Sequence, residues 1–132
     1  MTIAWGTLGY VWSKPVFIVL VKEPRYTYEL MKDNDEFTIS VPLNGQLKEE
    51  LIFCGTKSGR DYDKFKELNL TAEYQELNTP IIKECDFHLE CKVLYKQEVN
   101  GDDIPKKIHV LYYSSEGYHT MFFGEIVNTY MK

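Results

Sequence analysis

Residues 54–65 carry the side chains of this chain that are best suited to binding an anion. They read Cys-Gly-Thr-Lys-Ser-Gly-Arg-Asp-Tyr-Asp-Lys-Phe, with two glycines, two aliphatic hydroxyls and three cations. Ser58 is placed to cap a short helix, and Asp61 would complete an acidic variant of the capping box. On that helix Arg60 and Lys64 would stand four residues apart and share one face. Backbone N–H groups, a serine hydroxyl and two cations at a helix start suit a phosphate.

The same two cations also fit a role without any ligand. On a solvated helix, Arg60 and Lys64 would only balance Asp61, Asp63 and Glu67. Loops of this composition are common, so the residues alone favour that surface role. The sequence has no Gly-x-Gly-x-x-Gly, Walker loop or Gly-x-Ser-x-Gly. If the protein uses a nicotinamide cofactor, that cofactor would therefore bind as a substrate and would not be held by a Rossmann fold.

Composition limits the classes of protein that this chain can belong to. Its 132 residues fit one domain, and a hydrophobic fraction of 44% predicts a packed interior. The formal charge of -5 argues against a general nucleic-acid binder. No run of eighteen apolar residues predicts a membrane span, and residues 1–7 do not resemble a signal peptide. Three cysteines, an odd number, are most simply explained as reduced thiols in a cytoplasmic protein.

The elements that must position these side chains are mostly strands. Alternating or continuous apolar residues predict strands, and amphipathic spacing predicts about three short helices. Half-buried strands of this kind indicate a mostly antiparallel sheet that curls or closes, in a β-rich α+β domain. Loops are expected at residues 6–9 and 114–117. Strands are expected at residues 2–5, 15–21, 37–41, 70–74, 87–93, 108–113 and 119–130, and helices from residue 27, over 43–54, and after Ser58.

Cys85, His88 and Cys91 have a spacing that suggests metal ligands. On a strand, the side chains of residues 85 and 91 would face away from that of residue 88, because the side-chain period is two. The spacing also matches no usual zinc pattern. We therefore predict no metal site, two cysteines in the core, and an outward face that includes His88, Glu90 and Lys92.

Three segments together resemble one known family. Residues 54–65 match the pattern C-G-x-x-S-G-R-D-x-D-K-F. Residues 1–6, 14–17 and 25–27 match M-T-x-[SA]-W, K-P-V and R-Y-T, and residues 118–126 match H-T-x-F-x-G-E-[IV]. These patterns, in this order, are typical of the flavin reductase-like, flavoredoxin-type proteins, and the matches span most of the chain.

The resemblance implies that residues 1–132 are a single FMN-binding split β-barrel domain, and that it forms a homodimer with flavin at the subunit interface. Family members carry a strand before the M-T segment, so we expect this chain, which opens on Met1, to lack that N-terminal strand. In the family the ring lies against the M-T segment and the phosphate lies in the S-G-R loop. The implied cofactor-binding residues are Thr2, Ile3, Ala4, Trp5, Arg25, Thr27, Ser58, Gly59, Arg60 and Lys64.

His119 is the candidate catalytic residue. The family histidine that it matches lies near the flavin, where it would seat a nicotinamide or steady charge on the reduced ring. The alternative is an outward histidine on an edge strand. Trp5 and Trp12 would either flank the flavin ring or serve as ordinary packing, which is the commoner role.

The resemblance implies an oxidoreductase that accepts hydride from NAD(P)H on FMN and passes electrons to flavin, a protein or a small acceptor. The protein would supply orientation and electrostatics, and the cofactor would supply the chemistry. Two alternatives are a flavin-binding electron carrier without its own NAD(P)H activity and a non-catalytic interaction domain.

Overall fold

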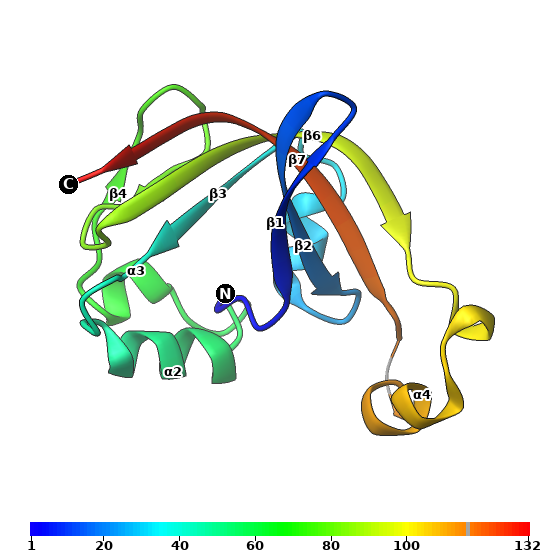
Figure 1. The fold of residues 1–132 in the computed structure, drawn as a ribbon. Coiled ribbons are helices and arrows are strands. Elements are labelled where there is room, and N and C mark those ends of the chain that lie inside the picture. Colours follow the sequence, from blue (N-terminus) through cyan, green and yellow to red (C-terminus); the bar gives the residue numbers. More distant parts are fainter. Residues whose placement is uncertain (116) are drawn as a thin grey trace.

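The structure is a computed structural model that describes residues 1–115 and 117–132. Its main feature is a five-stranded antiparallel sheet in the order β1-β2-β7-β6-β3. One half of the sheet arches over α2 and the N-terminal segment, and α4 lies beyond the opposite end of the sheet (Figure 1). Its strands are β1 (Gly6–Val11), β2 (Lys14–Lys22), β3 (Glu36–Val41), β6 (Phe87–Glu98) and β7 (His119–Met131).

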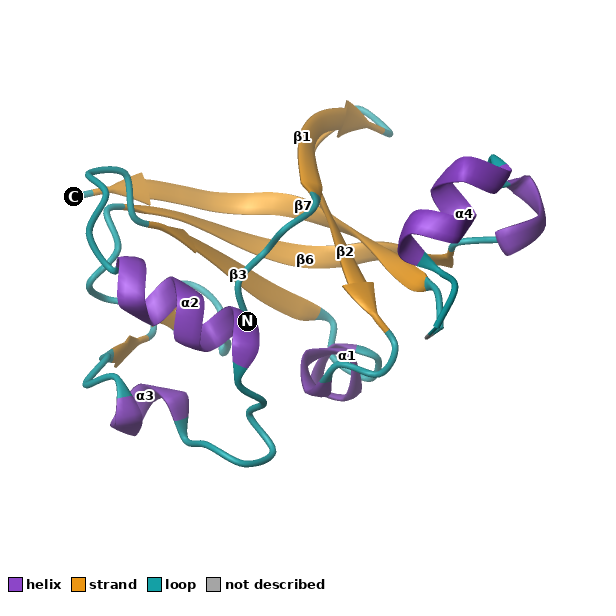
Figure 2. Ribbon diagram, turned by 90° about the horizontal axis from the view of Figure 1, so that it is seen from below, coloured by secondary structure: helices purple, strands orange, loops and turns teal. Residues whose placement is uncertain are grey.

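The remaining elements are short. The strands β4 (Ala72–Glu73) and β5 (Ile81–Ile82) form a separate two-stranded sheet. Among the described residues there are four α-helices, where the sequence predicts about three, and α1 to α3 lie on one side of the large sheet (Figure 2). These helices are α1 (Tyr26–Met31), α2 (Lys48–Thr56), α3 (Lys64–Glu67) and α4 (Lys106–Tyr112), with a 3-10 turn, η1 (Gly101–Asp103), before α4.

The large sheet is curved but not closed. Within the described chain, β1 pairs with β2 alone and β3 pairs with β6 alone, so two edges remain open. This is the arrangement of a split barrel, and it confirms the predicted fold class. The strands expected at residues 15–21, 37–41, 87–93 and 119–130 are all present.

Apolar side chains from both halves of the sheet form one core. Phe122 of β7 is fully buried at its centre. Around it lie apolar residues of β2, β3 and β6, namely Val19, Val21, Phe37, Ile39, Leu89 and Cys91. Because β7 pairs with β2 on one side and β6 on the other, this core fixes the register that places Lys22 opposite His119.

Gly124 of β7 is required by this packing. A Cβ added there would collide with the ring of Phe37 and approach Cβ of Cys91 to 2.8 Å. Overpacking of a core costs about 1–3 kcal/mol. We expect Gly124→Ala to lower the free energy of unfolding by that amount in urea titrations. Gly9→Ala is the matched control, since a Cβ at this β1 position meets nothing within 4 Å; equal losses in both variants would contradict the packing argument.

Several local predictions are wrong. Residues 2–5 are not a strand, and the expected loop at residues 6–9 lies within β1. The helix expected from Thr27 begins at Tyr26 after Arg25, and the helix expected over 43–54 begins only at Lys48. The predicted loop at 114–117 includes residue 116, which lies outside the described residues.

Residues 108–113, predicted as a strand, belong mainly to α4. Ile108, Leu111 and Tyr112 stand at i, i+3 and i+4, which is equally a helical spacing. Their β-branched and aromatic neighbours favoured a strand. No described strand pairs with this segment, and these three side chains are exposed. Without a sheet neighbour, the local helix is the conformation that satisfies the backbone hydrogen bonds.

The outward face predicted for β6 is wrong at His88 and Glu90, which are both fully buried. His88 lies between the Ser40 hydroxyl at 3.2 Å and the Cys85 carbonyl at 3.1 Å. Burial lowers the pKa of His88, so this ring is a neutral structural group rather than a surface one. The backbone N–H groups of Glu76 and Leu77 donate to Glu90 on this face, so alternation along β6 does not separate inside from outside.

The described part of the chain contains no helix that is long and apolar enough to cross a membrane.

Candidate functional site

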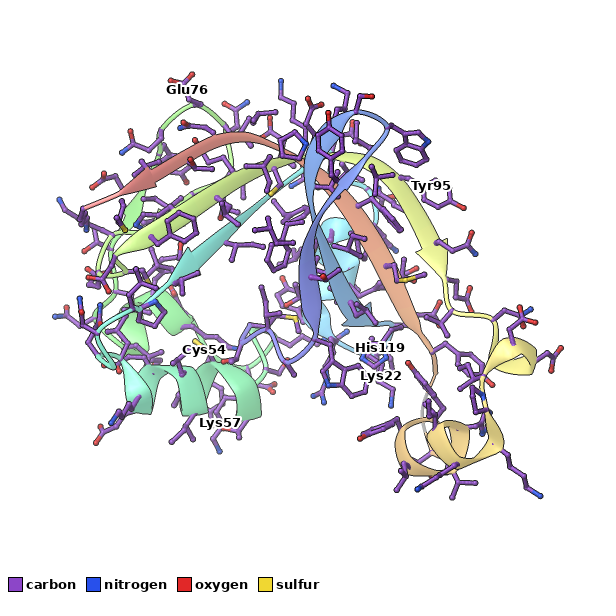
Figure 3. All side chains as sticks on the ribbon, in the orientation of Figure 1. Lys22, Cys54, Lys57, Glu76, Tyr95 and His119 are labelled. Atoms are coloured by element: carbon purple, nitrogen blue, oxygen red, sulfur yellow. The ribbon has the colours of Figure 1, made fainter. Side chains whose placement is uncertain are left out.

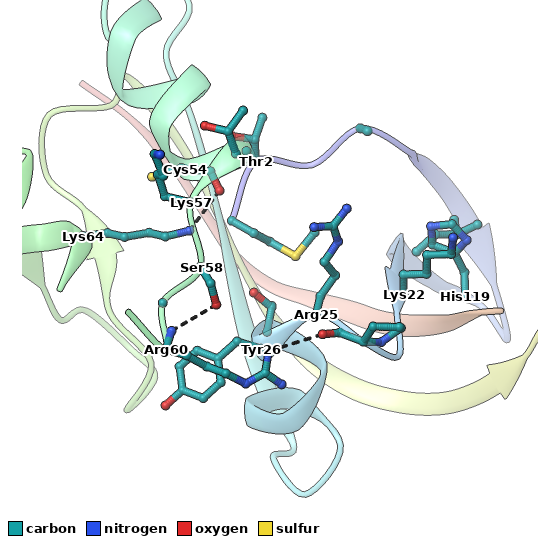
Figure 4. Close-up of a pocket in the computed structure, with 18 of the residues that line it drawn as sticks. Thr2, Lys22, Arg25, Tyr26, Cys54, Lys57, Ser58, Arg60, Lys64 and His119 are labelled. Carbon is teal, nitrogen blue, oxygen red and sulfur yellow. Dashed lines mark hydrogen bonds between the residues drawn. The ribbon is translucent and has the colours of Figure 1, made fainter. Parts of the chain in front are cut away.

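A cavity of about 480 Å³ opens where three segments meet: the N-terminal residues, the turn between β2 and α1, and the loop between α2 and α3 (Figure 4). Thr2, Ala4 and Trp5 line it from the first segment, and Arg25 and Thr27 line it from the second. The third segment and β7 complete the wall with Ser58, Gly59, Arg60, Lys64 and His119.

The structure therefore brings together every sequence-predicted site residue except Ile3. Ile3 is 36% exposed and does not line the cavity. Trp12, the second candidate to flank a ring, also lies elsewhere and packs near Tyr95 and Phe123. The assignment of the other residues to FMN is not tested by their position and stays a prediction.

The Ser58 loop reaches the cavity by a different route from the predicted one. Ser58 does not cap a helix; its Oγ accepts the backbone N–H of Arg60 at 3.1 Å. The cap of α3 is Asp63, whose carboxylate accepts the backbone N–H of Lys66 at 3.3 Å. Arg60 thus lies in the loop and Lys64 begins the helix, so they do not share a helical face. The turned loop nevertheless brings both cations to one cavity.

Lys64 is anchored by the preceding helix. Its ammonium donates to the Cys54 carbonyl at 3.0 Å, in the last turn of α2 (Figure 4). Carbonyl groups in the last turn of a helix lack helical partners and carry partial negative charge. This contact fixes the lysine head at the cavity wall, with donor capacity left for a ligand because an ammonium has three N–H groups.

Arg60 is held by the β2–α1 segment. Its guanidinium donates to the Pro24 carbonyl at 3.3 Å and forms an ion pair with Glu29. It also lies over the ring of Tyr26, 5.3 Å from the centroid. The same ring explains Gly59, where an added Cβ would approach Tyr26 Cδ1 to 2.9 Å. Arg60 is therefore oriented in advance, although Glu29 balances part of its charge.

The cavity is strongly cationic in a chain of net charge -5. Among the described residues that line it, none is Asp or Glu, and five are cations: Lys22, Arg25, Lys57, Arg60 and Lys64. For Arg25, no side-chain hydrogen bond to another described residue is found, so its charge is available to a ligand. A concave surface with one sign of charge concentrates ligands of the opposite sign.

Sequence reasoning missed Lys22, Lys57 and Tyr26 as lining residues. Lys57 occupies a variable position of the motif, beside Ser58, and its place in the loop was a usable signal. Lys22 becomes visible only through topology, because the β2–β7 register sets it opposite His119. Figure 3 shows Lys22 beside His119 and Lys57 at the end of α2.

His119 stands at the start of β7, a central strand rather than the edge strand of the alternative prediction. Its Nδ1 lies 2.9 Å from the hydroxyl of Tyr113, and its ring is tilted against Trp5 with centroids 4.8 Å apart. Burial lowers the pKa of His119, and the nearby charges of Lys22 and Arg25 lower it further. The ring is thus neutral at neutral pH and lies among cations.

Comparison with known proteins agrees with this geometry. The family model described as "Flavin reductase like domain" matches residues 1–132. An uncharacterized protein of Archaeoglobus fulgidus is 33% identical over 129 residues, which cover 97% of this chain and 62% of that protein.

Two solved structures are similar over 98% of this chain. Flavoredoxin from Methanosarcina acetivorans has a TM-score of 0.75 and 27% identity, and this chain covers 59% of it. An FMN-binding protein from Thermus thermophilus, solved with bound p-hydroxybenzaldehyde, has a TM-score of 0.74 and 22% identity, with 62% of it covered. The chain thus spans about three fifths of the length of these relatives. The match over all of its residues, together with the curved open sheet and the three segments that meet in one cavity, shows that this chain belongs to the flavin reductase-like domain family.

Proposed function

We propose that the cavity binds FMN and that the bound flavin accepts hydride from NAD(P)H. The observation that carries this proposal is the meeting of three distant segments around a cavity whose only charged lining residues, among those described, are cations. Small-molecule sites have volumes of roughly 300–1,000 Å³. The cavity, at about 480 Å³, falls within that range.

The residues present fit the chemistry of FMN. A phosphate needs cations and N–H donors, which Arg25, Lys57, Arg60 and Lys64 supply in the lining of the cavity. A planar ring needs an aromatic or apolar wall and backbone polar groups, which the segment from Thr2 to Trp5 can supply. When bound, the flavin supplies hydride and electron-transfer chemistry, and the chain's task is to bind and orient it.

His119 is the residue that we assign to the reacting partner. It lines the cavity with Lys22 and Arg25 beside it and Trp5 against its ring. A neutral imidazole there can donate one hydrogen bond to a ligand without adding charge. This supports a role in seating the nicotinamide of a visiting NAD(P)H.

Anaerobic titration with NADH and NADPH tests the hydride step. The FMN-loaded protein is expected to lose its visible absorption when either nucleotide is added. Bleaching by dithionite but by neither nucleotide would favour the electron carrier instead. If the protein binds no flavin, the non-catalytic interaction domain would be the remaining alternative. The acceptor, whether a redox partner protein or a small molecule, and a cytoplasmic location stay predictions.

We also propose a homodimer. Strand β1 is an open edge that presents Leu8 and Tyr10, and the turn after it presents Trp12; these side chains are 67%, 73% and 61% exposed. Two-fold pairing is the commonest way to cover such a surface. Light scattering is expected to give about twice the chain mass of 15.5 kDa at micromolar concentration. A mass of one chain across a wide concentration range would contradict the dimer.

A further inference from the structure

The C-terminal end of α4 reaches the cavity wall through two consecutive tyrosines, Tyr112 and the capping residue Tyr113. The hydroxyl of Tyr113 lies 2.9 Å from Nδ1 of His119. The carbonyl of Tyr112 accepts from the ammonium of Lys22 at 3.2 Å. The ring of Tyr112 meets Trp5 edge-on, with centroids 5.0 Å apart. Three residues of the wall, Lys22, Trp5 and His119, are therefore each held from α4 or its end.

The direction of the hydrogen bond decides what His119 can do. A neutral imidazole has one nitrogen that donates and one that accepts. If the phenol donates to Nδ1, the proton of His119 is on Nε2. If Nδ1 donates instead, the hydroxyl proton of Tyr113 has no acceptor among the described residues, whereas a donating phenol pairs its proton with the lone pair of Nδ1.

We propose that Tyr113 is a positioning residue whose O–H donates to Nδ1 of His119, holding that ring in the tautomer that offers Nε2–H to a ligand in the cavity. No described residue is bonded to Nε2 of His119, so this N–H is available. The assignment of the tautomer depends only on the structure. The further role of Nε2–H, as a donor to a carbonyl oxygen of a ring ligand, rests on the proposed function.

The charges around His119 favour the neutral ring that this arrangement needs. Lys22 faces it from β2 and Arg25 from the β2–α1 turn, and with burial they lower the pKa of His119. Burial raises the pKa of Tyr113, so its hydroxyl keeps its proton. Trp5 and Tyr112, which complete the surroundings, carry no charge at neutral pH. His109 bonds the Tyr118 hydroxyl at 2.9 Å, and its ring lies 6.3 Å from that of Tyr113 between centroids.

NMR of the flavin-free protein tests the tautomer directly. Nitrogen-15 shifts of His119 are expected to show a protonated Nε2 and an unprotonated Nδ1. Tyr113→Phe removes the donor to Nδ1, so the neutral ring should no longer be held in one tautomer, and the two nitrogen-15 shifts should move toward each other. The ratio of the two tautomers should change about fivefold, because one hydrogen bond is worth about 1 kcal/mol.

The opposite arrangement predicts the opposite shifts. If Nδ1–H donates to Tyr113, the neutral wild-type ring is protonated on Nδ1, and Tyr113→Phe would increase the population protonated on Nε2. Either result would overturn the proposal. Tyr112→Phe is the matched control, since no described residue bonds its hydroxyl, and it should leave the tautomer unchanged.

Reduction kinetics test the role of Tyr113 in the reaction. In the FMN-loaded protein, Tyr113→Phe should slow anaerobic reduction by NAD(P)H about fivefold, while the Kd for FMN changes less than twofold. An unchanged rate would overturn the positioning role. A wild-type protein that binds no FMN would refute the proposed function, and the NMR result would still decide the tautomer.

Discussion

Replacing Lys64 with alanine is expected to weaken FMN binding ten- to hundredfold and to leave riboflavin binding nearly unchanged. Its ammonium lies at the cavity wall, where it donates to the Cys54 carbonyl and retains further donors. A hydrogen bond to a charged group is worth roughly 1.5–3 kcal/mol, and 1.4 kcal/mol is tenfold in affinity. Riboflavin lacks the phosphate and so loses nothing from the missing cation. Fluorescence titration with both ligands measures the two affinities.

Lys66→Ala is the matched control for this variant. Lys66 lies on the same short helix, is exposed, and does not line the cavity. It removes the same charge from the chain and should change neither affinity. Because Lys64 also bonds α2, its variant should lose about 1 kcal/mol of unfolding free energy, which urea titration would detect. Equal losses of FMN and riboflavin affinity would mean that Lys64 supports the fold or the ring site rather than the phosphate.

Replacing Glu90 with alanine is expected to lower the free energy of unfolding by at least about 3 kcal/mol. The carboxylate is fully buried. It accepts from the backbone N–H of Leu77 at 3.0 Å, from that of Glu76 at 3.4 Å, and from the Asn128 amide at 2.8 Å. Each buried donor left without a partner costs about 1–3 kcal/mol. Removal of Glu90 therefore leaves the backbone N–H groups of Glu76 and Leu77 without their partner on the sheet.

Urea unfolding followed by circular dichroism measures this loss. Glu98→Ala is the control on the same strand, since Glu98 is exposed, and it should change stability by no more than about 0.5 kcal/mol. The amide protons of Glu76 and Leu77 should exchange with solvent faster in Glu90→Ala than in the wild-type protein or in Glu98→Ala. A loss below 1 kcal/mol, with unchanged exchange, would show that water replaces the carboxylate at little cost.

The strands of this fold were predictable where the pattern has one physical explanation. The run at residues 15–21 is continuous, β-branched and bounded by prolines, and it forms most of β2. Alternation at residues 37–41 gives β3 in the same way. Glu90 shows where prediction from alternation fails. A charged residue in an alternating strand is normally assigned to the solvent-exposed face, but here the backbone N–H groups of Glu76 and Leu77 donate to the buried Glu90 carboxylate.

The site was predictable from motif resemblance and not from local geometry. The expected helix cap at Ser58 is absent and Asp63 caps α3 instead, yet Ser58, Arg60 and Lys64 still line one cavity. Tyr113 could not be found from sequence. It reaches His119 only because the residues before it form α4, whose C-terminal end lies beside the start of β7.

Visible absorption of the purified protein tests the central claim most directly. The protein is incubated with excess FMN, and unbound flavin is removed by gel filtration. We expect the flavin absorption band to elute with the protein at a ratio near one FMN per chain. A protein fraction that repeatedly shows no flavin absorption, while remaining folded by circular dichroism, would contradict FMN binding at the cationic cavity.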